Sequence, residues 1–206
     1  MKIITISQQY GSGGGELSKR LADILQFDCY DKEIITAIAK NRTVDETYIK
    51  MGLDSYFVQP VVFTYRRYFG GATLQSYKTE LLLEQKHVIE EIAKAGRNCV
   101  IVGHNADVIL REYNPLSIFV CADLETKIRR CMEHASEGEN LSRRKIVSNI
   151  RNTDKSQARI REIMTSAKWG DPSTYDLTVN ATAWDINELA VALSHFVESW
   201  FDKKNE

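Results

Sequence analysis

Short runs of aliphatic and β-branched residues alternate with longer segments in which apolar residues recur at helical spacing. The short runs are expected to form five strands, at residues 3–7, 27–30, 98–102, 116–121 and 176–180. Helical periodicity extends over residues 16–26, 74–95 and 186–201. Asp31 and Asp123 each precede a further helical segment and are expected to cap it. Because the strands are apolar on both faces, we expect an α/β fold with a parallel sheet covered by helices on both sides.

Two stretches interrupt this alternation. Residues 42–73 contain an aromatic-rich run, which we interpret as a helical insertion on the substrate side. Its aromatic side chains are expected to pack together, with base stacking or a dimer contact as alternatives. Residues 137–168 are polar and basic, and we interpret them as a mobile helical flap that closes over a ligand. No repeat or proline-rich linker divides the chain, so residues 1–206 are expected to form one domain.

Composition and charge exclude several classes of function. Hydrophobic residues make up 43% and charged residues 27% of the 206 residues, which is the usual mix of a soluble globular protein. The 27 Lys and Arg nearly balance the 28 Asp and Glu, so bulk attraction to nucleic acid or to an anionic membrane is not expected. The four cysteines show no CxxC spacing, which indicates reduced thiols rather than disulfides or zinc. With no signal or membrane-spanning pattern, we expect a cytoplasmic protein.

A glycine-rich turn follows the first predicted strand. It contains Gly11, Ser12, Gly13, Gly14 and Gly15 and leads directly into the first predicted helix. Such a turn can point several backbone N–H groups at a phosphate, and the helix N-terminus adds partial positive charge. The sequence therefore favours an anion-binding loop, with a merely flexible connection as the alternative.

The loop departs from the standard nucleotide-binding patterns. Aligning GxxxxGK[ST] with the turn places Gln8 at the first glycine, Gly14 at the lysine and Gly15 at the hydroxyl position. Both side chains that normally reach the phosphates and magnesium are therefore missing. The dinucleotide pattern fits no better, because Glu16 stands at its third glycine.

Several further segments, taken with the glycine-rich turn, identify a resemblance to a known family. They run in one order over nearly the whole chain: Ile4 to Gly14, Tyr30 to Ile35, Val100 to Asp107, Asp154-Lys155, Lys168 to Pro172 and Tyr175 to Leu177. In these positions the chain resembles the cytidylate-kinase-like proteins, a branch of the P-loop nucleoside-monophosphate kinases. The joint match is specific, although each segment alone is weak.

The resemblance implies a fold and an activity. It implies a P-loop NTPase-type, five-stranded parallel sheet flanked by helices, with a nucleoside-monophosphate-binding insertion at 42–73 and an arginine-bearing lid at 137–168. The implied reaction is ATP-dependent phosphoryl transfer to a nucleoside monophosphate such as CMP, with Mg²⁺ accompanying the ATP. The implied partners are small nucleotides, not nucleic acid or a membrane, and a homodimer is compatible with the sequence.

The same resemblance implies roles for single residues. The backbone of Gly11, Ser12, Gly13, Gly14 and Gly15 would bind the ATP phosphates. Asp31 would orient the acceptor or hold a magnesium-bound water, and its role as a helix cap is an equal alternative. His104 and Asp107 would lie on the acceptor side. Arg130 at the base of the lid and Arg159 on the lid would stabilise charge on the transferred phosphoryl group.

Three departures from the family pattern bear on catalysis. The family pattern has an arginine at each position where this chain has Gly15, His104 and Gln157. Losing cations that stabilise the transition state would lower the rate by powers of ten. The sequence therefore leaves two alternatives to a nucleotide kinase, namely a non-catalytic nucleotide-binding or regulatory module and a kinase of another small molecule.

Overall fold

The protein is described from a computed structural model, which places residues 1–43, 46, 71–134 and 142–204. Five strands form one parallel sheet in the order β2-β3-β1-β4-β5. They are β1 (Ile3–Gln8), β2 (Asp28–Tyr30), β3 (Cys99–Val102), β4 (Leu116–Cys121) and β5 (Leu177–Asn180). The first strand is central, with Ile4 opposite Val100 of β3 and Thr5 opposite Ser117 of β4. The predicted five-stranded parallel α/β sheet is confirmed.

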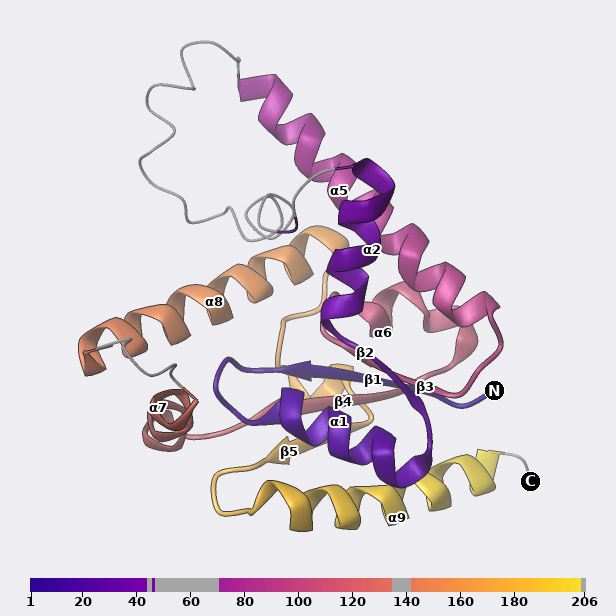
Figure 1. Cartoon of the computed structure of the whole chain (residues 1–206), viewed down its shortest axis with the longest axis vertical. Coiled ribbons are helices and arrows are strands. Elements are labelled where there is room, and N and C mark those ends of the chain that lie inside the picture. The colour runs from indigo at the N-terminus through magenta and orange to yellow at the C-terminus, as the bar shows by residue number, and fades with distance from the viewer. Residues whose placement is uncertain (44–45, 47–70, 135–141, 205–206) are drawn as a thin grey trace.

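Helices cover both faces of this sheet (Figure 1). They are α1 (Gly14–Leu25), α2 (Lys32–Arg42), α5 (Gly71–Lys94), α6 (Ala106–Ile109), α7 (Leu124–Glu133), α8 (Arg143–Met164) and α9 (Ile186–Lys204). Two short 3₁₀ helices are η1 (Arg111–Tyr113) and η2 (Pro172–Thr174). Helices α1 and α9 pack on one face, and α2, α5 and α6 lie on the other.

Each face of the sheet has its own hydrophobic core. On the α1–α9 face, Leu17 and Leu21 pack with Val197 against the inward side chains of β1, β3 and β4. On the opposite face, Ile38 of α2 and Ile89 of α5 pack with residues of β1 and β3. Because β1 and β3 contribute apolar residues to both cores, they lack an exposed face, as the sequence predicts, whereas the edge strand β5 exposes Thr178 and Asn180. The sheet therefore holds the loops at its carboxyl edge in fixed positions.

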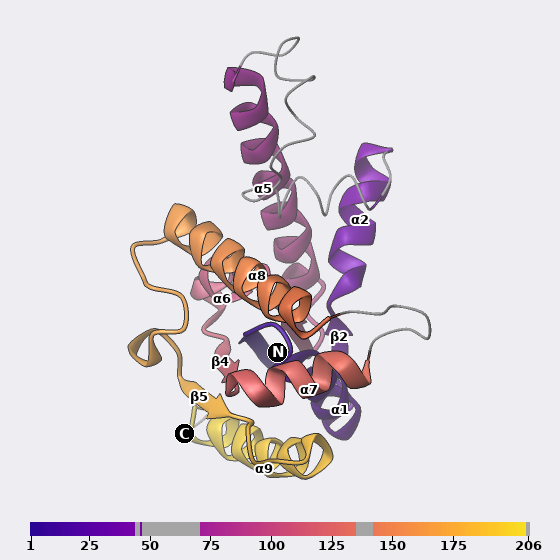
Figure 2. The same ribbon diagram turned by 90° about the vertical axis from the view of Figure 1, so that its left-hand side faces the viewer.

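Helices α7 and α8 lie at the carboxyl ends of the strands (Figure 2). Ile128 of α7 and Ile146 and Ile150 of α8 form a small third core, so the two helices pack as a pair. The predicted flap at 137–168 thus contains a 22-residue helix whose buried positions face the rest of the protein. Its motion on ligand binding stays a prediction.

The two predicted caps have different outcomes. Asp123 caps α7, because its carboxylate accepts the N–H of Thr126 at 2.6 Å. Asp31 lies at the N-cap position of α2, as predicted, but its side chain makes no capping hydrogen bond. Instead the Glu33 carboxylate accepts the N–H of Asp31 at 2.9 Å. The Asp31 carboxylate is therefore not used to cap α2.

Most of the predicted insertion at 42–73 falls outside the described residues, apart from the end of α2 and the start of α5. All four cysteines are free, as predicted, and burial raises the pKa of both Cys29 and Cys99 to about 11. Among the helices described, none has the length and apolar character needed to cross a membrane.

Candidate functional site

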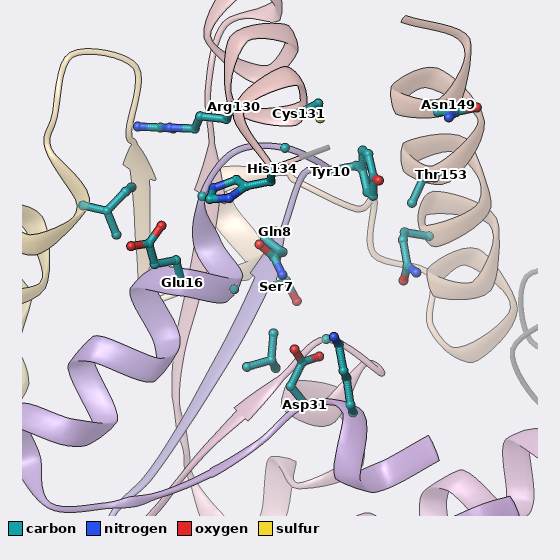
Figure 3. Close-up of a pocket in the computed structure, with 18 of the residues that line it drawn as sticks. Ser7, Gln8, Tyr10, Glu16, Asp31, Arg130, Cys131, His134, Asn149 and Thr153 are labelled. Atoms are coloured by element: carbon teal, nitrogen blue, oxygen red, sulfur yellow. The ribbon is translucent and has the colours of Figure 1, made fainter. Parts of the chain in front are cut away.

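A cavity of about 1340 Å³ opens at the carboxyl edge of the sheet. Its floor is the end of β1 and the glycine-rich turn, and its walls come from α7, α8 and the loop between β5 and α9. Figure 3 shows Gln8 and Ser7 at the centre, Asp31 on one side and the residues of α8 opposite. In parallel α/β sheets, ligands bind at this edge.

The glycine-rich turn is built around left-handed backbone. Gly11 and Gly13 have φ values of 77° and 89°, which residues other than glycine rarely adopt. A Cβ on Gly11 would lie 2.8 Å from Cys131 Sγ, so the turn also packs tightly against α7. Ser12 is fully buried, and its hydroxyl has no hydrogen-bond partner in the described part of the chain. The left-handed glycines and the close packing against α7 therefore define the conformation of the turn, which ends at the N-terminus of α1.

Arg130 links this turn to the loop between β5 and α9. Its guanidinium donates to the carbonyl oxygens of Ser12 (2.6 Å), Ala181 (3.0 Å) and Trp184 (3.2 Å). The side chain is 9% exposed but still lines the cavity. Three carbonyl contacts hold it against the loop, so in this structure Arg130 positions the loop. Its predicted role at the transferred phosphoryl group stays a prediction.

Replacing Arg130 by lysine is expected to loosen the turn. A lysine keeps the charge but cannot span three carbonyl groups, so the free energy of unfolding should fall by about 2 kcal/mol. Chemical denaturation measures this loss. Arg129→Lys is the matched control, because the Arg129 side chain is exposed and its ion pair with Glu133 is long, at 3.9 Å. An equal loss in both variants would contradict the positioning role.

A buried ion pair links the same turn to α8. Lys127 of α7 donates to Asp154 at 3.0 Å and to the Gln9 side chain at 3.3 Å. The other oxygen of Asp154 accepts the N–H of Tyr10 at 2.7 Å. The Lys127 and Asp154 side chains are 8% and 18% exposed, so water screens this pair weakly. The contact holds α8 beside the glycine-rich turn.

On the other side of the cavity, His104 is locked by its neighbours. Its Nδ1 lies 3.2 Å from Gln85 Oε1, while Gln85 Nε2 donates to the His104 carbonyl at 2.9 Å. Burial lowers the pKa of His104, and the nearby Asp31 partly opposes this effect. His104 also lies in left-handed backbone, between Gly103 and Asn105, which share that conformation. A neutral imidazole therefore stands where the family arginine is expected.

This environment of His104 predicts a pH dependence of stability. The folded pKa lies below the unfolded value, so the unfolded chain binds a proton first as the pH falls. Stability should be complete above about pH 6.5 and should fall below it, by about 1.4 kcal/mol for each unit of pKa difference. Urea midpoints at about pH 7.5 and about pH 5 measure the change. A His104→Asn variant that kept the same slope would contradict this assignment.

The face of α8 that lines the cavity is polar but uncharged. It presents Asn149, Thr153 and Gln157, one helical turn apart, flanked by Ile146 and Ile160. Arg159, predicted to act from the lid, and the lid cations Arg151 and Lys155 on the same helix are exposed and do not line the cavity. The helical register therefore turns the basic residues of the lid away from the space they were predicted to fill.

Asp107 also lies outside the cavity lining. Both of its oxygens accept from Nη1 of Arg161, at 2.7 and 2.6 Å, and the two side chains are 7% and 3% exposed. The guanidinium lies 5.3 Å from the centre of the Tyr175 ring. The structure thus uses Asp107 to anchor the C-terminal end of α8, whereas the sequence predicts that it binds substrate.

Of the predicted site residues, the cavity brings together Asp31, His104, Arg130 and the glycine-rich turn. It also includes two residues that sequence reasoning missed. Gln8 points into the cavity from the end of β1, and Trp184 is 49% exposed on its rim. The signal for Trp184 was an aromatic residue in a polar loop directly after the last strand.

Similarity to solved structures supports the fold. The chain matches a crystal structure of an uncharacterized protein from Eubacterium ventriosum at 23% identity, with a TM-score of 0.71 over 97% of this chain and 99% of that one. It also matches a shikimate kinase from Bacteroides thetaiotaomicron (16% identity, TM-score 0.56, 96% and 98% covered). A shikimate kinase from Acinetobacter baumannii in complex with shikimate is similar at 11% identity (TM-score 0.54, 97% and 94% covered).

These neighbours share the five-stranded parallel architecture of P-loop kinases. Among curated proteins, no match is found. The family model of the cytidylate kinase-like family matches residues 3–183, which include the whole sheet and the elements around the cavity up to the loop that precedes α9. The chain therefore belongs to the cytidylate kinase-like family.

Proposed function

We propose that this protein catalyses ATP-dependent phosphoryl transfer to a small-molecule acceptor, with a CMP-like nucleoside monophosphate as the first candidate. The observation that carries the proposal is the single cavity, which runs from the glycine-rich turn to Asp31 and His104. A kinase must hold a donor phosphate and an acceptor in one water-excluding space. The family membership supports phosphoryl transfer and favours a nucleotide as the acceptor.

The residues present fit a nucleotide triphosphate at the turn. The backbone N–H groups of residues 11–15 would bind its phosphates, aided by the N-terminus of α1. Mg²⁺ would neutralise charge on these phosphates. No cluster of three His, Cys, Asp or Glu lies close enough for metal binding within the described ranges, so we assign no protein ligand to it.

Asp31 is proposed to orient the acceptor. Its carboxylate is not used to cap α2, and it lines the cavity opposite α8. It would accept a hydrogen bond from a hydroxyl group of the acceptor, while Thr153 and Gln157 of α8 would donate to other polar groups of the acceptor. The attacking atom would be a phosphate oxygen of a nucleoside monophosphate, or the hydroxyl oxygen of an alcohol whose proton passes to Asp31. This oxygen would form its bond to the terminal phosphorus as the bond to ADP breaks.

A second acceptor class is favoured by the uncharged face of α8. Amides and a hydroxyl suit an alcohol better than a phosphate-bearing acceptor, which needs cations. We therefore include small polyols and hydroxy acids beside the nucleoside monophosphates. Because the four free thiols suit a reducing compartment, we place the reaction in the cytoplasm.

The test is a screen of ADP formation by the purified protein against all nucleoside monophosphates and a panel of small alcohols, beside calorimetric titration of ATP. Acceptor-dependent turnover is expected. ATP binding without turnover for any acceptor would support the non-catalytic module instead. If ATP neither bound nor turned over, the proposal would be lost and only the fold would remain.

A further inference from the structure

The end of β1 and the first turn of α1 interlock where nucleotide-binding loops carry their lysine. A Cβ built on Gly14 would lie 2.8 Å from the Cβ and 2.6 Å from the Oε1 of Gln8. In the GxxxxGK[ST] alignment these are the first glycine position and the lysine position. The side chain of Gln8 therefore fills the volume that a side chain at position 14 would need. The two departures from the motif are therefore linked: a side chain is present at position 8, where the motif has glycine, and absent at position 14, where the motif has lysine.

The amide of Gln8 is placed to meet a ligand. Its Nε2 lies 3.4 Å from a Cβ built on Gly15, so the amide lies along the first turn of α1 (Figure 3). It lines the cavity, and nothing in the described part of the chain hydrogen-bonds to it. An amide NH₂ beside a helix N-terminus can donate to a phosphate oxygen.

We propose that Gln8 takes the place of the missing lysine and is the side chain of this loop that contacts the phosphates of the bound nucleotide. The inference rests on the proposed function for the identity of its ligand. The interlock between positions 8 and 14 is independent of that function. The contact is uncharged, so the loop binds phosphate through N–H donors rather than through an ammonium group.

The interlock is tested by thermal denaturation without ligand. Gly14→Lys should lower Tm by several degrees, because its Cβ overlaps that of Gln8. Adding Gln8→Ala should not restore Tm, since alanine keeps the Cβ. Adding Gln8→Gly should bring Tm back to that of the Gln8→Gly single variant. A Gly14→Lys protein as stable as the wild type, or equal behaviour of the two double variants, would overturn the interlock.

The contact is tested by calorimetric titration of ATP. Gln8→Ala should weaken binding about fivefold, the loss of one modest hydrogen bond. Gln8→Glu keeps the shape but replaces the donor with a negative charge, so a loss of more than about tenfold is expected. Gln8→Lys should strengthen binding about tenfold. Ile24→Lys, which adds the same charge at the far, exposed end of α1, should leave the affinity unchanged.

The outcomes separate this inference from the proposed function. Wild-type protein that binds ATP with an affinity indifferent to Gln8→Glu and Gln8→Lys would overturn the contact alone. Wild-type protein that binds no ATP would overturn the proposed function and the contact with it. A graded order of Lys above Gln above Ala above Glu supports the contact.

Discussion

Asp107→Ala is expected to destabilise the protein by about 4 kcal/mol, the usual cost of leaving one partner of a buried ion pair uncompensated. Arg161 would lose both contacts to the Asp107 oxygens while remaining almost fully buried. Its Nε has no hydrogen-bond partner among the residues that the structure places, and the guanidinium would keep its contact with the Tyr175 ring. Chemical denaturation measures the loss, and a smaller one than about 2 kcal/mol would contradict the anchoring role.

Two controls separate this effect from a general loss of charge. Glu125→Ala breaks the exposed pair between Glu125 and Arg143 and should cost less than about 1 kcal/mol. Replacing the buried pair together, as Asp107→Leu with Arg161→Met, removes both charges. This double variant should recover most of the stability lost in Asp107→Ala, because no uncompensated charge remains.

Adding arginines at two positions on the cavity wall is expected to raise kcat by about 100-fold, by analogy with a transition-state arginine. The variant is Gly15→Arg with Gln157→Arg. Gly15 tolerates a side chain, because its φ is not positive and no atom lies closer than 3.4 Å to an ideal Cβ. Gln157 already lines the cavity. His104 is left unchanged, because its ring is buried and held by Gln85.

The control adds the same charge to α8 outside the cavity. Asn152→Arg lies on the exposed side of the helix and should leave kcat unchanged. Steady-state kinetics with the best acceptor from the screen measures both variants. An unchanged kcat in the double arginine variant would mean that the charge of the transferred group develops elsewhere in the cavity.

The fold was largely predictable because the sheet is buried on both faces. The strands are short apolar runs, and the helices α1, α5 and α9 each show an apolar stripe, so the pattern places them within a few residues. The ends were less certain. The sequence places Asp31 at the N-cap of α2 correctly, but its side chain makes no capping bond and Asp31 lines the cavity. The pattern identifies a capping residue but does not fix the direction of its side chain.

The site was less predictable, because residue roles depend on which way a helix faces. Sequence order places Arg159 on the lid, but only the register of α8 shows that Gln157 faces the cavity and Arg159 does not. Likewise, Asp107 follows β3 as a ligand-binding residue would, but its carboxylate accepts a hydrogen bond from Arg161, which lies far along the chain. The alignment shows Gln8 and Gly14 as two separate departures from the motif. Only the short distance between Gln8 and a Cβ built on Gly14 shows that the two departures are linked.

The central claim is that the glycine-rich turn and Asp31 hold the two partners of one phosphoryl transfer. A crystal structure with a non-hydrolysable ATP analogue tests it most directly. Phosphate density is expected against the backbone of residues 11–15, with the terminal phosphate directed toward Asp31 across the cavity. Density for the analogue at another surface, or no density at the turn at saturating concentration, would contradict it.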